Sequence, residues 1–349
     1  MKKVTYKNSH NFFRFNGFHF DSKSMQIAAY YLIKEGEPHE KAIGEFLLDW
    51  FDEKAYIDLQ TSGTTGIPKI IRKNKQALVN SALATGDFFE LKPGDTALCC
   101  LPVEFIAGKM MLVRSFILGL ATDFVAPNAN PLAKINKKYN FVAMVPLQVQ
   151  NSLNDLYKVD KLIIGGAKID SELEKKLLGI KTQVYETYGM TETITHIAAK
   201  KVGEQAFTIL PNVSISQNEN NCLIIDAPQV SEERLFTNDL VDLINDTQFV
   251  LLGRIDNVVN SGGIKLIPEQ IESKLSPSIN ARFFVGGIPD EVLGEKLVLV
   301  IEGKSQDLDE AIFTVLDKFE KPKAVFFVLV FEMTESGKVK RKTILKALE

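Results

Sequence analysis

A chain of 349 residues is longer than a single hydrophobic core usually supports, so we expect two domains. A hydrophobic fraction of 45% and a charged fraction of 24% are typical of globular proteins, and the net charge of -3 argues against nucleic acid or an acidic membrane as the main partner. The N-terminus lacks the apolar stretch of a signal peptide and no run of about 18 apolar residues occurs, which predicts a cytoplasmic protein without a membrane span. The cysteines Cys99, Cys100 and Cys222 are too few and too irregularly spaced for a disulfide framework or a zinc site.

Short apolar runs alternate with segments of helical periodicity from Ile57 to about Leu210. We expect strands at Thr96–Leu101, Thr122–Ala126, Phe141–Val145 and Lys161–Ile164. The helices expected among them cover Asn74–Phe89, Gly108–Leu120, Leu147–Leu156 and Ser171–Leu178. This alternation predicts an α/β fold whose mostly parallel sheet is covered by helices on both faces.

The pattern changes after Val202, where short strands are joined by polar turns. These strands, at Phe207–Ser216, Cys222–Asp226, Arg234–Phe236 and Phe249–Leu252, predict a small antiparallel β subdomain attached to the parallel sheet. The rest of the chain predicts an α+β unit with helices at Pro268–Leu275 and Asp309–Asp317 and strands at Arg282–Val285, Lys296–Glu302 and Ala324–Phe331. We therefore divide the chain into a large N-terminal domain, residues 1–255, and a smaller C-terminal domain, residues 256–349.

One loop has the composition of a phosphate-binding site. It follows the expected strand Ile57–Gln60 and consists of Thr61, Ser62, Gly63, Thr64, Thr65, Gly66, Ile67, Pro68 and Lys69. Its glycines let backbone N–H groups approach an anion closely, while the hydroxyls and the lysine add donors and charge. It is not the loop of P-loop nucleotide hydrolases, since Lys-Ser or Lys-Thr does not follow Gly66. The alternative, an ordinary polar surface loop, is improbable for this string.

This loop resembles the phosphate-loop signature of the adenylate-forming superfamily, which comprises acyl-CoA synthetases, luciferases and peptide-synthetase adenylation domains. Further segments resemble motifs of the superfamily in the same order: Gly165-Gly166-Ala167, Tyr188-Gly189-Met190-Thr191-Glu192, Thr237-Asn238-Asp239 followed by Gly253-Arg254-Ile255-Asp256, and Ser336-Gly337-Lys338-Val339-Lys340-Arg341. The resemblance extends from about Ile57 to the end of the chain.

The resemblance implies that ATP, Mg²⁺ and coenzyme A bind to this chain. It implies an adenine site of Gly165, Gly166, Ala167, Glu186, Tyr188 and Gly189, in which adenine stacks on the tyrosine ring. Thr191 would donate to a phosphate or carboxylate oxygen and Glu192 would ligate Mg²⁺. Asp239 would accept hydrogen bonds from both ribose hydroxyls, with Arg254 beside it.

The resemblance also implies a mobile C-terminal domain that carries the catalytic Lys338. This lysine would offset the negative charge that develops when a carboxylate attacks the α-phosphorus of ATP. Asp256 would be the hinge about which the domain rotates after adenylation. Gly262 and Gly263 would line a narrow channel for the thiol of coenzyme A, although two glycines also suit an ordinary turn.

The phosphate loop begins at Thr61, much nearer the N-terminus than in the long acyl-CoA synthetases. With this loop position and with the segments Leu101–Gly108 and Tyr188–His196, the chain most resembles, within the superfamily, the short o-succinylbenzoate–CoA ligases of menaquinone biosynthesis. Their acid carries a second carboxylate, for which Lys109 and Arg114 are the candidate partners; they lie five positions apart, so they do not share a helix face. His196 is a candidate contact of the acid or a structural histidine. Two alternatives stay open: another aryl- or acyl-CoA ligase, and a nucleotide-binding module without catalysis. The sequence leaves the oligomeric state open.

Overall fold

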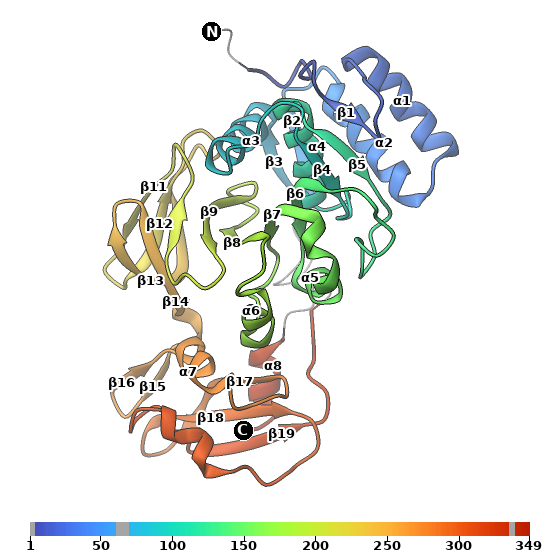
Figure 1. Ribbon diagram of the computed structural model, residues 1–349. Coiled ribbons are helices and arrows are strands. Elements are labelled where there is room, and N and C mark those ends of the chain that lie inside the picture. The colour runs from blue at the N-terminus through green and yellow to red at the C-terminus, as the bar shows by residue number, and fades with distance from the viewer. Residues whose placement is uncertain (1–3, 61–69, 335–338) are drawn as a thin grey trace.

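The computed structural model describes residues 4–60, 70–334 and 339–349 (Figure 1). Its largest element is a sheet whose first half is parallel. The strands of that half are, in spatial order, β1 (Arg14–Phe15), β5 (Ala121–Phe124), β4 (Thr96–Cys99), β6 (Tyr139–Met144), β7 (Val159–Ile164) and β8 (Gln183–Gly189). The parallel α/β layer predicted from the sequence is therefore confirmed. No helix capable of crossing a membrane occurs in the described parts of the chain.

Helices cover both faces of this parallel half. One face is covered by α1 (Ser22–Glu35), α2 (Pro38–Phe51), α3 (Lys75–Phe88) and α4 (Ile106–Leu118), and the other by α5 (Pro146–Asn151), the 3₁₀ helix η1 (Leu153–Lys158) and α6 (Ser171–Leu177). The strand side chains alternate between two cores, as the two-residue period of a strand requires. Cys99 and Phe141 join the first core, whereas Cys100 and Val142 join the second.

The second half of the sheet is antiparallel and continues directly from β8. Its strands are, in order, β9 (His196–Lys201), β10 (Phe207–Ile209), β14 (Gln248–Arg254), β13 (Leu235–Asn245), β12 (Cys222–Asp226) and β11 (Ser214–Gln217). The antiparallel subdomain is thus hydrogen-bonded to the parallel half in one twelve-stranded sheet within the described residues.

Two predictions for this region were wrong in detail. The expected strand Phe207–Ser216 is two strands, because Pro211 lacks the backbone N–H that a ladder needs and Asn212 adopts a left-handed φ of 64°. The expected strand Arg234–Phe236 is the start of the much longer β13, which pairs with β12 on one side and β14 on the other.

A separate hairpin frames the predicted phosphate loop. The strands β2 (Tyr56–Gln60) and β3 (Ile70–Asn74) pair antiparallel, with Gln60 opposite Ile70. The Arg72 guanidinium of β3 makes two hydrogen bonds to the Asp58 carboxylate of β2 and lies 3.9 Å from the centre of the Tyr56 ring. The hairpin therefore pairs Gln60 with Ile70, the two described residues that flank residues 61–69 in the sequence.

The C-terminal strands form a second sheet, drawn below the large one in Figure 1. After the 3₁₀ turn η2 (Ile255–Asn257) come β15 (Val259–Ser261), β16 (Ile264–Leu266), α7 (Pro268–Leu275), β17 (Phe283–Asp290), β18 (Gly294–Glu302), η3 (Glu310–Val315), β19 (Ala324–Val328) and α8 (Arg341–Lys346). The helix expected at Asp309–Asp317 is instead the short 3₁₀ segment η3, consistent with its β-branched Ile312, Thr314 and Val315, which disfavour an α-helix. The division at residues 255/256 as a boundary of motion stays a prediction.

Candidate active site

The predicted ribose-binding carboxylate lies in a network of charged and polar side chains at the ends of β8 and β14 and within β13. The Tyr188 hydroxyl donates to Asp239 Oδ2 at 2.5 Å, and Arg254 Nη1 donates to Asp239 Oδ1 at 3.1 Å. The second guanidinium nitrogen, Arg254 Nη2, lies 3.0 Å from Asp256 Oδ2, and Asn238 also donates to that carboxylate. The structure thus brings together five residues of the predicted motifs.

The surroundings of Tyr188 and Asp256 determine their protonation states. Burial, together with the Asp239 charge, raises the pKa of Tyr188, so the phenol stays protonated and serves as a donor. Hydrogen bonds from Arg254 and Asn238 lower the pKa of Asp256, so this carboxylate stays ionised. The Tyr188 ring is 8% exposed because Phe207 and Phe249 pack against it. Stacking of adenine on it stays a prediction.

The predicted adenine turn lies between the ends of β7 and β8. Gly166 has a φ of 86°, a conformation that favours glycine. Thr187 Oγ1 donates to the Ile164 carbonyl at 2.9 Å and lies only 3.0 Å from where a Cβ on Gly165 would stand. Glu186, on the same strand, pairs with Lys200 of β9 at 3.1 Å, so its carboxylate is held in place by a partner that the motif does not include.

The segment that carries Thr191 and Glu192 is tightly folded between β8 and β9. A Cβ on Gly189 would stand 2.3 Å from the Thr195 carbonyl oxygen, so the two ends of the segment touch. Thr193 Oγ1 accepts from the Met190 N–H at 3.0 Å and donates to the Thr195 carbonyl at 2.7 Å. The buried Ile194 has a φ of 70°, which is a strained conformation for a β-branched residue.

A lysine outside the predicted motifs contacts this segment. Lys73 of β3 donates from its ammonium group to the Glu192 carbonyl at 2.6 Å. Burial lowers the pKa of Lys73, and the charges of Glu192 and Glu232 oppose that effect. A cavity of about 710 Å³ is lined by Arg72, Lys73, Asn74, Glu192 and Glu232, among other residues. The sequence signal for Lys73 was only its place after the phosphate loop.

Arg114, predicted as a partner of the acid, is a buried cation. It lies on α4, is 2% exposed, and has no carboxylate within 4.0 Å in the part of the chain that the structure describes. Its guanidinium instead approaches neutral groups: Thr85 Oγ1 at 3.4 Å, Thr195 Oγ1 at 3.3 Å and His196 Nδ1 at 3.5 Å. Burial lowers the pKa of Arg114 from 12.5 to about 10.

His196 is buried beside this cation and is neutral. Burial, and then the Arg114 charge, lower the pKa of His196 well below its usual value of 6.5. Its Nε2 is 3.3 Å from Thr85 Oγ1. A narrow cavity of about 20 Å³, lined by Asn80, Ser81 and Ala84 of α3, reaches His196. This space is too small for an aromatic acid, so binding of such an acid next to His196 requires the cavity to widen.

Lys109, the other candidate for the acid, faces a different environment. Its ammonium donates to the carbonyls of Val103 and Glu104, at 2.9 and 2.7 Å, and thereby closes the turn before α4. Burial lowers its pKa, and Glu104 counteracts this effect. The structure therefore separates the two cations, as their spacing on the helix predicted.

Comparison with known proteins identifies the family. The sequence matches the family described as AMP-binding enzyme over residues 52–228, which is half of the chain. The chain belongs to this family. The matched residues cover the parallel half of the sheet apart from β1, together with the segments around Gly166 and Tyr188, and they end before Asp239.

Several members of the AMP-binding family resemble the chain over most of its length. The 2-succinylbenzoate–CoA ligase of Staphylococcus aureus is 25% identical over 324 residues, which cover 82% of this chain and 66% of that protein. The enzyme of the same name from Haemophilus influenzae is 26% identical, with 81% and 69% of the two chains covered. This chain thus spans about two thirds of the length of these curated relatives.

Solved structures show the same fold. An acyl-CoA synthetase (AMP-forming)/AMP-acid ligase II-like protein from Dyadobacter fermentans is 34% identical, with a TM-score of 0.61 and with 90% of this chain and 95% of that chain covered. The o-succinylbenzoate coenzyme A synthetase of Bacillus subtilis, in complex with ATP and magnesium ion, has a TM-score of 0.72 at 21% identity. The match covers 83% of this chain and 69% of that chain. The latter likeness concerns the fold alone.

Some predicted site residues of this family member lie outside the described residues. These are the phosphate-loop residues Thr61, Ser62, Gly63, Thr64, Thr65 and Lys69, and the catalytic candidate Lys338. Gly262 and Gly263 are described, with φ of 60° and 84°, and they form the turn between β15 and β16. That turn accounts for both glycines, and their contact with coenzyme A stays a prediction.

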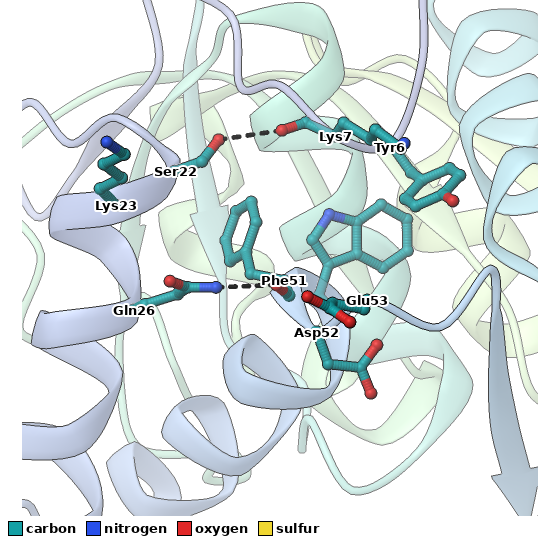
Figure 2. Close-up of a pocket in the computed structure, with 9 residues that line it drawn as sticks. Tyr6, Lys7, Ser22, Lys23, Gln26, Phe51, Asp52 and Glu53 are labelled. Atoms are coloured by element: carbon teal, nitrogen blue, oxygen red, sulfur yellow. Dashed lines mark hydrogen bonds between the residues drawn. The ribbon is translucent and has the colours of Figure 1, made fainter.

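Outside the predicted motifs, the described residues offer a cavity but no cluster of metal ligands. The described residues hold no group of three or more His, Cys, Asp or Glu side chains placed to bind a metal. A cavity of about 480 Å³ lies between the N-terminal segment, the start of α1 and the end of α2 (Figure 2). Its walls include Lys7, Lys23, Asp52 and Glu53, and none of its lining residues has a predicted role.

Proposed function

We propose that this chain is an ATP-dependent, AMP-forming acid–thiol ligase whose acid is o-succinylbenzoate, the substrate of the corresponding step in menaquinone biosynthesis. A carboxylate oxygen of the acid attacks the α-phosphorus of ATP, which forms an acyl-adenylate and releases pyrophosphate. The thiol of coenzyme A then loses its proton, its sulfur attacks the acyl carbon, and AMP leaves with the product thioester formed.

The network around Asp239 supports the nucleotide part of this proposal. Tyr188 and Arg254 hold the carboxylate in one orientation, and an ionised carboxylate accepts hydrogen bonds from two adjacent ribose hydroxyls. Gly165 and Gly166, directly after β7, are the residues proposed to lie against the adenine, and the φ of 86° at Gly166 is one that favours glycine. Thr191 and Glu192 lie on the segment that follows Tyr188, and Lys73 of β3 contacts the Glu192 carbonyl.

The single observation that carries the choice of acid is the buried Arg114 cation without a carboxylate partner in the described chain. A buried charge is costly unless an opposite charge offsets it. The ring carboxylate of o-succinylbenzoate would supply that charge, with Thr195 and the neutral His196 as further polar contacts. The acid would then extend from Arg114 towards the segment of Thr191 and Glu192, which lies a few residues before Thr195 in the sequence.

The remaining catalytic groups follow from the family resemblance. Bound Mg²⁺ neutralises part of the phosphate charge, and Glu192 is the side chain proposed to hold it. Lys338 is proposed to stabilise the charge on the α-phosphorus during adenylation. Rotation about Asp256 would then withdraw Lys338 and admit the thiol past Gly262 and Gly263.

An acid panel tests the proposal. Pyrophosphate release and CoA-thioester formation are measured with o-succinylbenzoate, with benzoylpropanoate, which lacks only the ring carboxylate, and with benzoate and octanoate. We expect o-succinylbenzoate to be preferred over benzoylpropanoate by about 10⁴-fold in kcat/KM, because the analogue leaves the buried cation unpaired. Equal rates with octanoate would contradict the choice of acid. ATP binding without pyrophosphate release from any acid would instead indicate a nucleotide-binding module.

A further inference from the structure

Lys73 connects two parts of the protein that the sequence keeps far apart. Its ammonium group lies 2.6 Å from the main-chain carbonyl oxygen of Glu192, 119 residues further along the chain. The residue stands on β3, which begins where the predicted phosphate loop ends. A hydrogen bond from a charged donor at this distance is among the strong ones in proteins. The contact therefore ties the hairpin of the phosphate loop to the segment of Thr191 and Glu192.

The neighbouring cation on β3 makes no such contact. Successive side chains of a strand point to opposite faces, and Arg72 accordingly pairs with Asp58 on the hairpin itself. Its guanidinium also lies over the Tyr56 ring. Arg72 and Lys73 thus carry the same charge one residue apart on one strand, but only Lys73 reaches the 189–196 segment.

The backbone conformation of the segment that Lys73 contacts depends on residues of other elements. Ile194 is held at a φ of 70°, and such strain persists only where the surroundings determine the conformation. Internal hydrogen bonds of Thr193 close the segment at its middle. Arg114 contacts its far end at Thr195, while Lys73 contacts the peptide group directly after Glu192. Without Lys73, the side that carries Thr191 and Glu192 loses a strong contact.

The charges around Lys73 also belong to the region of the Glu192 segment. Its ammonium group is partly removed from water, and the carboxylates of Glu192 and Glu232 are the charges that act on it. All three residues line the same cavity of about 710 Å³. The lysine therefore reduces the repulsion that two carboxylates would exert on an incoming polyphosphate, in addition to fixing the main chain.

We propose that Lys73 is a positioning residue for adenylation: its hydrogen bond to the Glu192 carbonyl fixes the direction of the Thr191 and Glu192 side chains relative to the β2–β3 hairpin. This inference rests on the proposed function for its catalytic part, whereas the positioning itself is a property of the free protein. Lys73 acts on the first half-reaction, because the second one no longer involves the β- and γ-phosphates.

The test compares Lys73→Met, Lys73→Arg and the matched control Arg72→Met. Methionine keeps an unbranched apolar stem and removes the charge, and arginine retains a charged donor. Amide hydrogen exchange of the 190–196 segment is measured in the free protein. We expect exchange in Lys73→Met to be faster by about tenfold or more, the factor of a charge-assisted hydrogen bond, with partial restoration in Lys73→Arg and no change in Arg72→Met.

The catalytic arm uses the same variants in ATP–pyrophosphate exchange and in thioester formation from prepared acyl-adenylate. For Lys73→Met we expect a tenfold or greater fall in kcat of adenylation and a higher Mg²⁺ concentration at half-maximal rate, with an unaltered second half-reaction. Unchanged hydrogen exchange, or equal effects of Lys73→Met and Arg72→Met, would overturn the inference. A wild-type protein inactive with every acid would refute the proposed ligase function, while the exchange arm would still decide whether Lys73 positions the segment.

Discussion

Replacement of Arg114 by methionine tests whether this cation binds a ligand or stabilises the fold. The fall of the Arg114 pKa from 12.5 to about 10 corresponds to roughly 3 kcal/mol against the charged form, at about 1.4 kcal/mol per pH unit. The hydrogen bonds that the guanidinium makes in return are long, between 3.3 and 3.5 Å to Thr85, Thr195 and His196. We therefore expect Arg114→Met to leave the free protein as stable as the wild type or more stable by about 1–2 kcal/mol.

The same substitution should strongly weaken binding of the acid. Removal of one partner of a buried charge pair costs about 2–5 kcal/mol, which corresponds to a KM for o-succinylbenzoate that is higher by roughly 30-fold to several thousand-fold. The KM for ATP should stay unchanged. Lys109→Met is the matched control on the same helix, since the Lys109 ammonium is engaged by the carbonyls of Val103 and Glu104, and its effect on the KM of the acid should be small.

Two measurements decide this prediction together. Urea denaturation without ligand gives the stability of the free protein, and a repeat with saturating acid gives the stabilisation by binding, about 2.7 kcal/mol at a concentration of 100 times Kd. The acid should stabilise the wild type and Lys109→Met but not Arg114→Met. If Arg114→Met destabilises the free protein by more than about 3 kcal/mol and leaves the KM of the acid unchanged, the cation is structural and our reasoning about its missing partner is wrong.

Further predictions concern the nucleotide, the C-terminal domain and pH. Lys338→Ala should abolish adenylation but spare thioester formation from prepared acyl-adenylate; equal loss of both half-reactions in a folded variant would contradict its assigned role. Asp239→Ala should raise the KM for ATP through the loss of about 1.5–3 kcal/mol of hydrogen bonding to ribose, and an unchanged ATP affinity would show that the carboxylate binds something else. Asp256→Pro should permit adenylation and block thioester formation because proline fixes φ, whereas normal rates of both would move the hinge elsewhere. His196 has a lowered pKa in the folded protein, so its contribution to stability is present above about pH 6.5 and is lost as the pH falls below this value. The loss is up to about 1.4 kcal/mol per pH unit. In urea denaturation between about pH 7.5 and 5, the free energy of unfolding of His196→Gln should therefore depend less on pH than that of the wild type.

Much of the fold follows from local sequence patterns. The apolar runs at β4, β6 and β7 predicted a parallel sheet because strands buried on both faces have few polar positions. The helix Pro268–Leu275 was placed at its observed bounds, with a proline at its start. The expected end of α4 at Leu120 was two residues late, because Gly119 takes a left-handed φ of 74° and terminates the helix. The motifs likewise name Tyr188, Asp239 and Arg254 without reference to structure.

The contacts among those residues were decided by the tertiary structure. Tyr188 and Asp239 are separated by 51 residues and meet only because β8 and β13 lie in one sheet, with β9, β10 and β14 between them. Sequence left Lys109 and Arg114 equivalent as candidates, and the packing of α4 against the sheet buried one cation and left the other at a turn. The contact of Lys73 with Glu192 depends in the same way on where a hairpin and a distant loop pack. Periodicity and motif spacing report what neighbours along the chain can form, whereas burial, charge pairing and pKa depend on groups that only folding brings together.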